Sequence, residues 1–295
     1  MHTDEVEIDE PLVRHLIATQ MPELGGLSLE RVEPWGTDNA VWRLGEDLVV
    51  RLPRIHWATG QVDLESLWLP RLTPFVPVSI PEPIATGEPD DRYPWRWGVF
   101  RWLSGVPAGP ATIADPVAFA MDLADVVRAL SRIPTEGAPP ATNRARPIAA
   151  YNDITLLMID HVSHLIDAEA ARRVWKAAME AKPHDGAPVW VQGDLEGNCI
   201  VVRGRLSGIV DWGSACAGDP AVDVQVVWSP LFTDESRRAF VHTLDIDDAT
   251  LARSRGAAVH QACAALGYYM DTYPLIVERS WHKLAAVGVE AKSGP

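Results

Sequence analysis

The segment from residue 189 to residue 213 constrains this chain most, because polar residues interrupt its short apolar runs at defined places. The apolar runs predict three short strands, at 188–192, 199–202 and 206–210. Asp194 and Asn198 lie in the loop after the first of these strands, and Asp211 follows the third. The pattern therefore predicts two strand-end loops that carry carboxylate and amide groups.

These side chains suit the chemistry of phosphoryl transfer. That reaction needs a carboxylate that orients the acceptor hydroxyl and oxygen ligands that hold Mg²⁺ on the phosphates. Asp194, Asn198 and Asp211 supply both kinds of group. A lone Gly-Asp or Asp-Trp-Gly would mean little, since Asp and Gly after a strand usually form an ordinary turn. The order and spacing of the three residues make the pattern specific.

The part of the chain before residue 104 has the pattern of a small lobe built on a sheet. Its apolar runs predict five strands, at 27–34, 40–44, 48–52, 83–87 and 97–103. The spacing of apolar residues over 61–72 predicts a helix, and Asp9 followed by Pro11 marks the start of an earlier one. Residues 104–107 suit a linker, so we expect an N-terminal nucleotide-binding domain at 1–103.

The rest of the chain, 104–295, is expected to form a second domain with the catalytic loop and the acceptor site. Helical spacing predicts helices over 116–133, most of 152–182 and the stretch from 220 to the end, and a Pro-rich loop occupies 134–147. The expected fold class is therefore α+β, with a small antiparallel-sheet N-terminal lobe and a mainly helical C-terminal lobe.

The segment at 189–213 resembles the aminoglycoside phosphotransferase family, which has a two-lobed, protein-kinase-like fold. The family's catalytic loop reads H-G-D-x-x-x-x-N and its metal-binding turn reads D-[FW]-[GE], whereas this chain has Q-G-D-L-E-G-N and D-W-G. The resemblance extends to A-G-D-P-A-V-D-V at 217–224, W-G-T-D-N-A-V-W-R-L at 35–44, L-V-V-R-L-P-R at 48–54 and W-L-P-R-L at 68–72. It therefore covers most of the chain.

The resemblance implies roles for the matching residues. Asp194 matches the catalytic carboxylate, and Asn198 and Asp211 match the metal ligands. A nucleotide, ATP or GTP, is expected to lie between the lobes with Mg²⁺. A loop would lie over its phosphates, a cation with its ion-pair partner would contact them, and the end of a strand would hold the base. In this order, the residues are Gly36, Thr37, Asp38 and Asn39, then Arg51 and Glu65, then Arg101, Trp102 and Leu103. Candidates for contact with the acceptor lie in a late helix: Tyr268, Tyr269 and Asp271.

Arg51 stands where kinases have a lysine that contacts the α- and β-phosphates and pairs with a helix glutamate. The substitution agrees with the composition, because all the lysines of the chain lie in its C-terminal part, at Lys176, Lys182, Lys283 and Lys292. Arginine keeps the charge and can bind phosphate oxygens through two nitrogens. Glu65, on the predicted helix, is the expected partner of Arg51.

The chain departs from the family pattern at two places. Gln192 replaces the histidine of the loop, and glutamine can hydrogen-bond like a neutral histidine. The interval from Asp194 to Asn198 is one residue shorter, which displaces the chain by up to about 3.3–3.6 Å. Gly197 allows the loop to be rebuilt, and Glu196 offers another oxygen ligand. Two outcomes stay open: catalysis with altered metal geometry, or a binding module without catalysis.

Charge and composition limit the partners. The net charge of −14, from 40 acidic and 26 basic residues, disfavours nucleic acid and attracts a cationic small molecule, although acidity can also serve solubility alone. Three scattered cysteines favour a reducing cytoplasm. An acidic N-terminus and the lack of a long apolar run disfavour secretion and membrane insertion. We expect a cytoplasmic monomer or homodimer.

Other polar residues are assigned to structure. Asp219 and Asp223 are expected to cap a helix or brace a loop, since Asp219 precedes Pro220. His161 and His164 form an H-x-x-H pair, but no third zinc ligand is indicated nearby.

The resemblance thus implies a Mg²⁺-dependent kinase that phosphorylates a hydroxyl of an antibiotic such as an aminoglycoside, giving resistance by modification. A metabolic small-molecule kinase and a catalytically silent ligand-binding protein of the same fold are the alternatives.

Overall fold

The computed structural model describes residues 5–33, 36–142 and 144–292, and the chain divides into two compact units. The first unit comprises Met1–Ser104 and Gly208–Gly213, and the second comprises Gly105–Ser207 and Ser214–Pro295. The first contains an antiparallel sheet and the second is mainly helical, which confirms the predicted α+β class. The short segment 208–213 belongs to the first unit, although the order of the chain assigned it to the second predicted domain.

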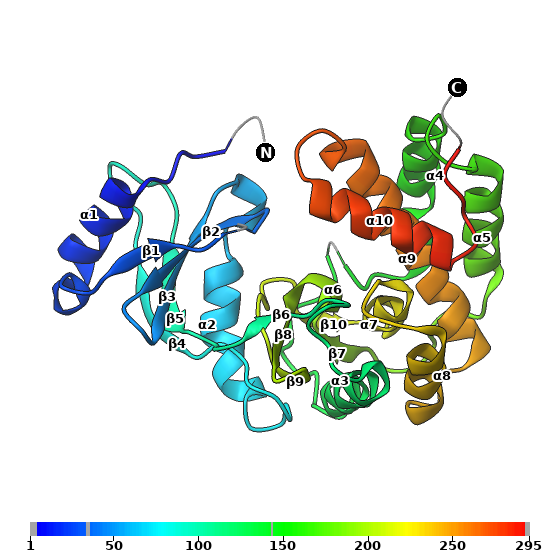
Figure 1. The fold of residues 1–295 in the computed structure, drawn as a ribbon, viewed down its shortest axis with the longest axis horizontal. Helices are drawn as coiled ribbons and strands as arrows, with labels where there is room; N and C mark the ends of the chain where they lie inside the picture. Colours follow the sequence, from blue (N-terminus) through cyan, green and yellow to red (C-terminus); the bar gives the residue numbers. More distant parts are fainter. Residues whose placement is uncertain (1–4, 34–35, 143, 293–295) are drawn as a thin grey trace. The chain divides into compact units, whose positions relative to one another are not determined.

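The sheet of the first unit has the strand order β1-β2-β3-β5-β4, with antiparallel neighbours (Figure 1). Its strands are β1 (Leu29–Arg31), β2 (Asn39–Leu44), β3 (Leu48–Pro53), β4 (Pro83–Gly87) and β5 (Trp97–Arg101). Gly45 turns the β2–β3 hairpin with a φ of 61°, a conformation that glycine adopts without steric cost. The five predicted strands are confirmed, except that Pro34, at the end of the first prediction, lies outside the described residues.

Helices α1 (Glu10–Gln20) and α2 (Gln61–Leu72) lie in the same unit as this sheet. Asp9 caps α1 by accepting a hydrogen bond from the Leu12 amide at 2.9 Å. The α1 side chains share a buried cluster with Val50 and Leu52 of β3. Because side chains alternate along a strand, Arg51 points to the opposite face, where it meets α2.

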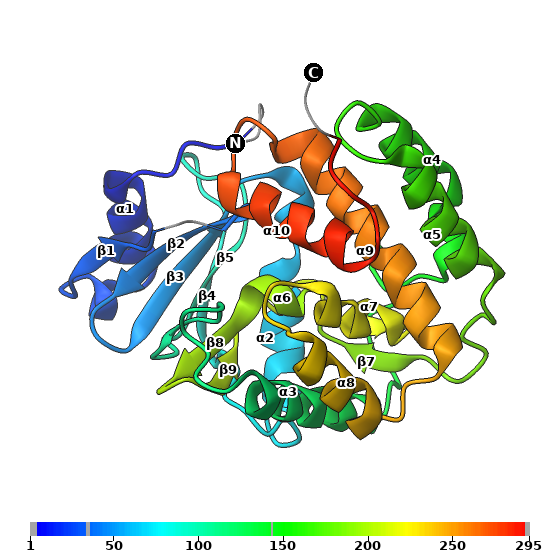
Figure 2. The ribbon, with the colours of Figure 1, turned by 45° about the vertical axis from the view of Figure 1, so that its right-hand side comes forward.

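The second unit is built around α9 (Asp248–Tyr269), which contacts helices from both earlier and later parts of the chain (Figures 1 and 2). The other helices are α3 (Pro116–Ser131), α4 (Asn152–His161), α5 (Ala168–Glu180), α7 (Ala221–Val224), α8 (Asp234–Thr243) and α10 (Pro274–Ala286). Asp115 caps α3 and Asp167 caps α5. None of the helices that the structure describes is long and apolar enough to cross a membrane.

Short strands in the second unit carry the polar loops. β7 (Val189–Val191) pairs with β10 (Cys216–Gly218), and β8 (Cys199–Val202) lies between β6 (Val106–Pro107) and β9 (Arg205–Ile209). The strands predicted at 188–192, 199–202 and 206–210 are confirmed as β7, β8 and β9. The sequence did not predict β6 and β10, because strands of two or three residues leave too short a pattern to recognise.

Candidate active site

In the first unit, Arg51 and Glu65 form a buried ion pair. Arg51 Nη1 lies 2.7 Å from Glu65 Oε1 and 2.8 Å from Oε2. The Glu65 side chain is fully buried and that of Arg51 is 9% exposed. The strand therefore presents its guanidinium to the helix, and the ion pair expected from the sequence is present.

Asp211 joins this pair from the segment 208–213. Arg51 Nη2 donates to Asp211 Oδ1 at 3.0 Å, and the neighbouring Trp212 amide donates to Glu65 Oε1 at 2.8 Å. Asp211 has a φ of 55°, which is uncommon for a residue other than glycine and is often found at functional positions. Its side chain is 44% exposed, so its carboxylate stays accessible beside the buried pair.

The charges around Arg51 fix its protonation. Burial on its own lowers the pKa of the guanidinium, but the carboxylates of Glu65 and Asp211 outweigh this effect and raise the pKa above its usual value. Arg51 is therefore a permanent cation, and one of its nitrogens is committed to Glu65. The guanidinium also lies 5.4 Å from the centre of the Phe100 ring.

In the second unit, Asp194 follows β7 at a sharp turn. Gly193 has a φ of 87°, and an added Cβ there would lie 3.2 Å from the Ser214 carbonyl oxygen. The Asp194 amide donates to Gln192 Oε1 at 2.6 Å. Gln192, which replaces the expected histidine, is fully buried and thus holds the backbone of Asp194.

The shortened loop closes as one helical turn, α6 (Leu195–Asn198), which the sequence did not predict. Asn198 lies four residues after Asp194, and its Nδ2 donates to the Asp194 carbonyl at 2.8 Å. The nitrogen end of the amide is engaged, so Oδ1 is the end that suits a cation. The missing residue has therefore not moved Asn198 away from Asp194.

Glu196, the other oxygen ligand considered from the sequence, contacts a helix. Its Oε2 lies 2.5 Å from Lys283 Nζ of α10, and Lys283 also donates to Gln261 at 2.5 Å. This buried contact ties the loop to α9 and α10, so Glu196 has a structural partner.

Asp223 and Asp219 brace the site, as the sequence predicted. Asp223 accepts bonds from the Gln192 amide at 2.9 Å and the Gly193 amide at 2.8 Å. Burial raises the pKa of Asp223 to about 6, against the lowering effect of these two amide bonds. Asp219 accepts from the Ala221 amide and forms an ion pair with the buried Arg253 at 2.8 Å.

Arg144 is a residue of this site that sequence reasoning missed. Its Nη1 donates to the Gly193 carbonyl at 3.1 Å, and its Nη2 lies 3.3 Å from Asp194 Oδ2. Arg144 comes from the Pro-rich loop 134–147, about fifty positions before Asp194, so neither spacing nor periodicity in the sequence connects them. The only available signal was the pair of arginines, Arg144 and Arg146, near the end of this loop.

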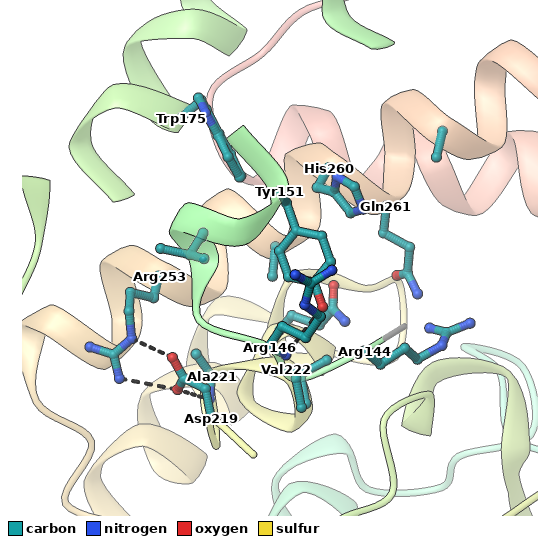
Figure 3. A pocket seen from close by; sticks show the side chains of 15 residues that line it. Arg144, Arg146, Tyr151, Trp175, Asp219, Ala221, Val222, Arg253, His260 and Gln261 are labelled. Carbon is teal, nitrogen blue, oxygen red and sulfur yellow. Dashed lines mark hydrogen bonds and ion pairs between the residues drawn. The ribbon is translucent and has the colours of Figure 1, made fainter. Parts of the chain in front are cut away.

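A pocket of about 300 Å³ opens beside Arg144 within the second unit (Figure 3). The loop that carries Arg144 and Arg146 forms one part of its wall, and α9 forms another through residues that include His260. Trp175 of α5 completes the aromatic lining. The pocket thus lies next to the residue that contacts Asp194.

The proposed acceptor residues do not line this pocket. Tyr268 and Tyr269 form the last positions of α9, and Asp271 lies in the turn that follows, whereas the α9 residues that line the pocket all lie between positions 253 and 264. A helix turns every 3.6 residues, so Tyr268 lies about one turn beyond the last lining residue. The contact of Tyr268, Tyr269 and Asp271 with the acceptor therefore stays a prediction.

The expected nucleotide residues lie in the first unit. Asp38 accepts from Trp57 Nε1 at 3.2 Å, and the buried Asn39 donates to Gln61 Oε1 at 2.9 Å. The Gly36 carbonyl accepts a hydrogen bond from Arg54 at 3.5 Å, and Thr37 lies between Gly36 and Asp38 in the same loop. The W-G-T-D-N motif is therefore folded against the start of α2, while its first residue, Trp35, lies outside the described residues.

At the expected base-binding strand end, β5 finishes at Arg101. Arg101 lies 3.5 Å from Glu82 on the surface, and the Trp102 amide donates to the Asp47 carbonyl at 2.8 Å. The Trp102 amide is thus engaged within the sheet region, and Leu103 follows it as the remaining residue of the predicted segment.

In the described ranges, no three His, Cys, Asp or Glu side chains gather as a metal site. Mg²⁺ differs from zinc, because it keeps several waters and needs only one or two protein oxygens besides substrate phosphates. An exposed Asp211 carboxylate and an Asn198 amide oxygen are donors of the type that fits Mg²⁺.

An antiparallel sheet with a buried cation–carboxylate pair, together with a helical unit that carries an Asp loop, defines a protein of the kinase-like phosphotransferase class. The chain belongs to the phosphotransferase enzyme family known as APH, whose sequence profile matches residues 30–259. No curated protein matches the chain by sequence comparison.

Solved structures share the fold over nearly the whole chain. Wild-type aminoglycoside 2′-phosphotransferase-IIIa in complex with GDP is 20% identical, with a TM-score of 0.71, over 95% of this chain and 99% of that chain. A type I macrolide 2′-phosphotransferase is 18% identical, with a TM-score of 0.65, over 93% and 97%. The apoenzyme of a macrolide 2′-phosphotransferase from Brachybacterium faecium is 22% identical, with a TM-score of 0.59, over 94% and 96%.

Proposed function

We propose that this protein transfers the γ-phosphate of a nucleoside triphosphate, ATP or GTP, to a hydroxyl of a small molecule. The observation that carries the proposal is the contact of one guanidinium, that of Arg51, with both Glu65 and Asp211. In kinases the strand cation, the helix glutamate and the metal-binding aspartate must all be in place for phosphoryl transfer. The proposal agrees with the family to which the chain belongs.

On the nucleotide side, Arg51 would bind phosphate oxygens while Glu65 holds it in place. The loop Gly36–Asn39 would cover the phosphates, and the end of β5, with Arg101, Trp102 and Leu103, would contact the base. A solved structure of the same fold was determined with GDP, which supports a nucleotide as the donor.

On the acceptor side, Asp194 would orient the acceptor hydroxyl and accept its proton. Its side chain is 37% exposed and its backbone is held by Gln192, so the carboxylate is fixed yet accessible. Asn198 and Asp211 would hold Mg²⁺, which when bound neutralises charge on the phosphates. Such preorganised groups are usually the main source of rate enhancement in this chemistry.

An antibiotic is the acceptor class that the structural neighbours suggest, since their names specify aminoglycosides and macrolides. Phosphorylation of the drug would then give resistance by modification. The negative charge of the chain favours a cationic aminoglycoside, whereas the arginine-rich pocket beside Asp194 does not. A metabolic kinase acting on another hydroxyl compound is the alternative that this pocket favours.

A silent ligand binder of the same fold is the remaining alternative, and the contact between Arg144 and Asp194 favours it. A guanidinium in contact with the proposed catalytic carboxylate would compete with the acceptor hydroxyl for it unless the acceptor displaces the guanidinium. Gln192 and Asn198 argue for catalysis, because both hold the shortened loop in order around Asp194.

Turnover measurements decide between these functions. The protein is incubated with ATP or GTP, Mg²⁺ and a panel of aminoglycosides, macrolides and simple hydroxy acids, and both nucleoside diphosphate release and acceptor mass are followed. A phosphorylated acceptor supports the proposal. Tight nucleotide or ligand binding with no phosphorylated product from any acceptor would instead identify a silent binder.

A further inference from the structure

The pocket beside Arg144 is basic, although the chain as a whole is strongly acidic. Among the described residues that line it, Asp219 is the only acidic one, and Arg253 neutralises it through bonds of 2.8 and 3.2 Å. Arg144 and Arg146 add two further guanidinium groups (Figure 3). No carboxylate in the described part of the chain pairs with Arg146, and the partner of Arg144 is Asp194.

The two arginines are held in place by the surrounding backbone. Ala145, between them, has a φ of 57°, and its carbonyl accepts a bond from the Asp219 amide at 2.9 Å. The Arg146 amide donates to the Tyr151 hydroxyl at 3.1 Å, and its guanidinium lies 5.7 Å from the centre of the Tyr151 ring. An uncommon backbone conformation fixed by the structure around it is typical of ligand-binding positions.

Apart from the Arg253–Asp219 pair, the remaining wall is uncharged, and three rings form part of it. The His260 ring lies 4.9 Å from the Tyr151 ring and 6.5 Å from the Trp175 ring, and Nδ1 of His260 lies 2.8 Å from the Thr155 hydroxyl. Burial, with the nearby charge of Arg144, lowers the pKa of His260 to about 4, so it is neutral near pH 7. The pocket thus combines ring faces with two cations.

The volume of about 300 Å³ is at the small end of the range for small-molecule sites. A polycationic acceptor would meet two like charges here and no unpaired carboxylate among the lining residues, and such juxtapositions are unfavourable. An oxyanion would instead find two planar guanidinium groups, which suit carboxylate and phosphate geometry.

Arg144 connects this pocket to the proposed chemistry, because it reaches Asp194 Oδ2 at 3.3 Å and the Gly193 carbonyl at 3.1 Å. An anion that draws Arg144 toward the pocket would weaken its contact with Asp194. The carboxylate would then be released for the acceptor hydroxyl at the moment when the correct molecule binds.

We propose that this pocket binds the acceptor, and that the acceptor is a small hydroxy compound with an aromatic ring and an oxyanion group held by Arg144 and Arg146. The inference rests on the proposed phosphotransferase function, and it replaces the expected cationic acceptor with an anionic one. Arg144 and Arg146 determine specificity, and the ring of the acceptor packs on Tyr151 and His260.

Binding to the full-length protein tests the charge preference without any turnover. Three probes share a phenyl ring and a hydroxyl and differ in charge: 3-phenyllactate has a carboxylate, 3-phenyllactamide has a neutral amide, and phenylalaninol has an ammonium, with its hydroxyl on the neighbouring carbon. By calorimetry or ligand-observed NMR, phenyllactate should bind about tenfold tighter than the amide. Phenylalaninol should bind weakest, and added salt should narrow the differences.

Substitutions of the two arginines test whether they cause the preference for the carboxylate. Arg146→Gln and Arg144→Gln should each weaken phenyllactate about tenfold and change binding of the amide by less than about twofold. Arg173→Gln, at an exposed arginine of the same unit that is 71% accessible, is the matched control and should change neither. Thermal unfolding of each variant checks that the second unit is intact. Equal affinity for the three probes, or tightest binding of phenylalaninol, would overturn the proposal.

Turnover separates this inference from the proposed function. If an aminoglycoside is phosphorylated and its KM is unchanged in Arg146→Gln while phenyllactate neither binds nor inhibits, the function stands and the anionic pocket is wrong. If phenyllactate binding depends on both arginines but no acceptor is ever phosphorylated, the pocket assignment stands and the phosphotransferase proposal fails. The same binding measurement with inorganic phosphate distinguishes an aromatic oxyanion from a free inorganic one. Inorganic phosphate has no ring to pack on Tyr151 and His260, so it should bind more weakly than phenyllactate.

Discussion

Asn198 donates a hydrogen bond of 2.8 Å from its side-chain amide to the backbone carbonyl of Asp194. The bond spans four residues and closes a single helical turn, so the loop needs no additional residue to bring the two together. It also orients the amide, because the nitrogen is used as a donor and the oxygen is left to face a cation.

Replacing Asn198 with alanine removes both the hydrogen bond and the oxygen donor. We expect kcat to fall about 100-fold, and the Mg²⁺ concentration for half-maximal activity to rise, since ligand and supporting contacts typically contribute on this scale. The free energy of unfolding should fall by only about 1 kcal/mol. Steady-state kinetics across a Mg²⁺ titration measure both effects.

Asn198→Asp is the informative companion. The carboxylate restores oxygen ligands for Mg²⁺ but cannot donate a hydrogen bond to the Asp194 carbonyl. The Mg²⁺ concentration for half-maximal activity should therefore return toward the wild-type value while kcat stays low. Wild-type kcat and an unchanged Mg²⁺ titration in Asn198→Ala would show that this side chain has no part in the reaction.

The buried pair of Arg51 and Glu65 predicts a large loss of stability in Glu65→Gln. The substitution leaves a permanent guanidinium in a buried position without its main counter-charge, which typically costs about 3–5 kcal/mol. Glutamine also offers one oxygen where the carboxylate accepts from both Arg51 and the Trp212 amide. Chemical denaturation should detect the lower free energy of unfolding.

The matched control is Asp63→Asn on the same helix. Asp63 pairs with Arg96 on the surface, where its side chain is 47% exposed, so its loss should cost less than about 1 kcal/mol. An equal loss in the free energy of unfolding for the two substitutions would mean that the buried pair stabilises the first unit no more than the surface pair does.

Asp223 predicts a pH dependence of stability. Its pKa is about 6 in the folded protein against a usual value of 3.8, mainly because of burial. The raised pKa means that the folded state holds a proton which the unfolded state has lost, so stability is greatest below about pH 4 and falls as pH rises through 6. The gap between the two values corresponds to about 3 kcal/mol.

The measurement compares the unfolding free energy of the wild type with that of Asp223→Asn from pH 4 to pH 7. The asparagine variant lacks this titration, so the stability of the wild type relative to the variant should decrease by about 3 kcal/mol over the range. A difference that stays constant, or grows with pH, would contradict the burial argument.

Local signals predicted much of the fold. Apolar spacing gave α2 with the bounds Gln61–Leu72, and Gly45 marked the β2–β3 hairpin, because both depend on residues close in the sequence. The Arg51–Glu65 pair was also predictable, since alternation along β3 places an arginine on the face that α2 covers.

Contacts between distant segments were not predictable. Arg144 reaches Asp194 from a loop without periodicity, and nothing in the sequence indicates that Asp219 fixes the neighbouring Ala145. The part of α9 that lines the pocket was not predictable either, and the acceptor role of Tyr268, Tyr269 and Asp271 stays a prediction. The sequence predicts a late helix, but the packing of α9 against α5 and α7 decides which of its turns is exposed to the pocket.

Asp194→Asn tests the central claim most directly. The substitution keeps the size and the backbone contacts of a side chain that is 37% exposed, so folding and nucleotide binding should remain close to wild type. With an acceptor that the wild-type protein phosphorylates, kcat should fall at least about 100-fold while the Kd for the nucleotide is unchanged. Turnover that survives in Asp194→Asn would contradict the account.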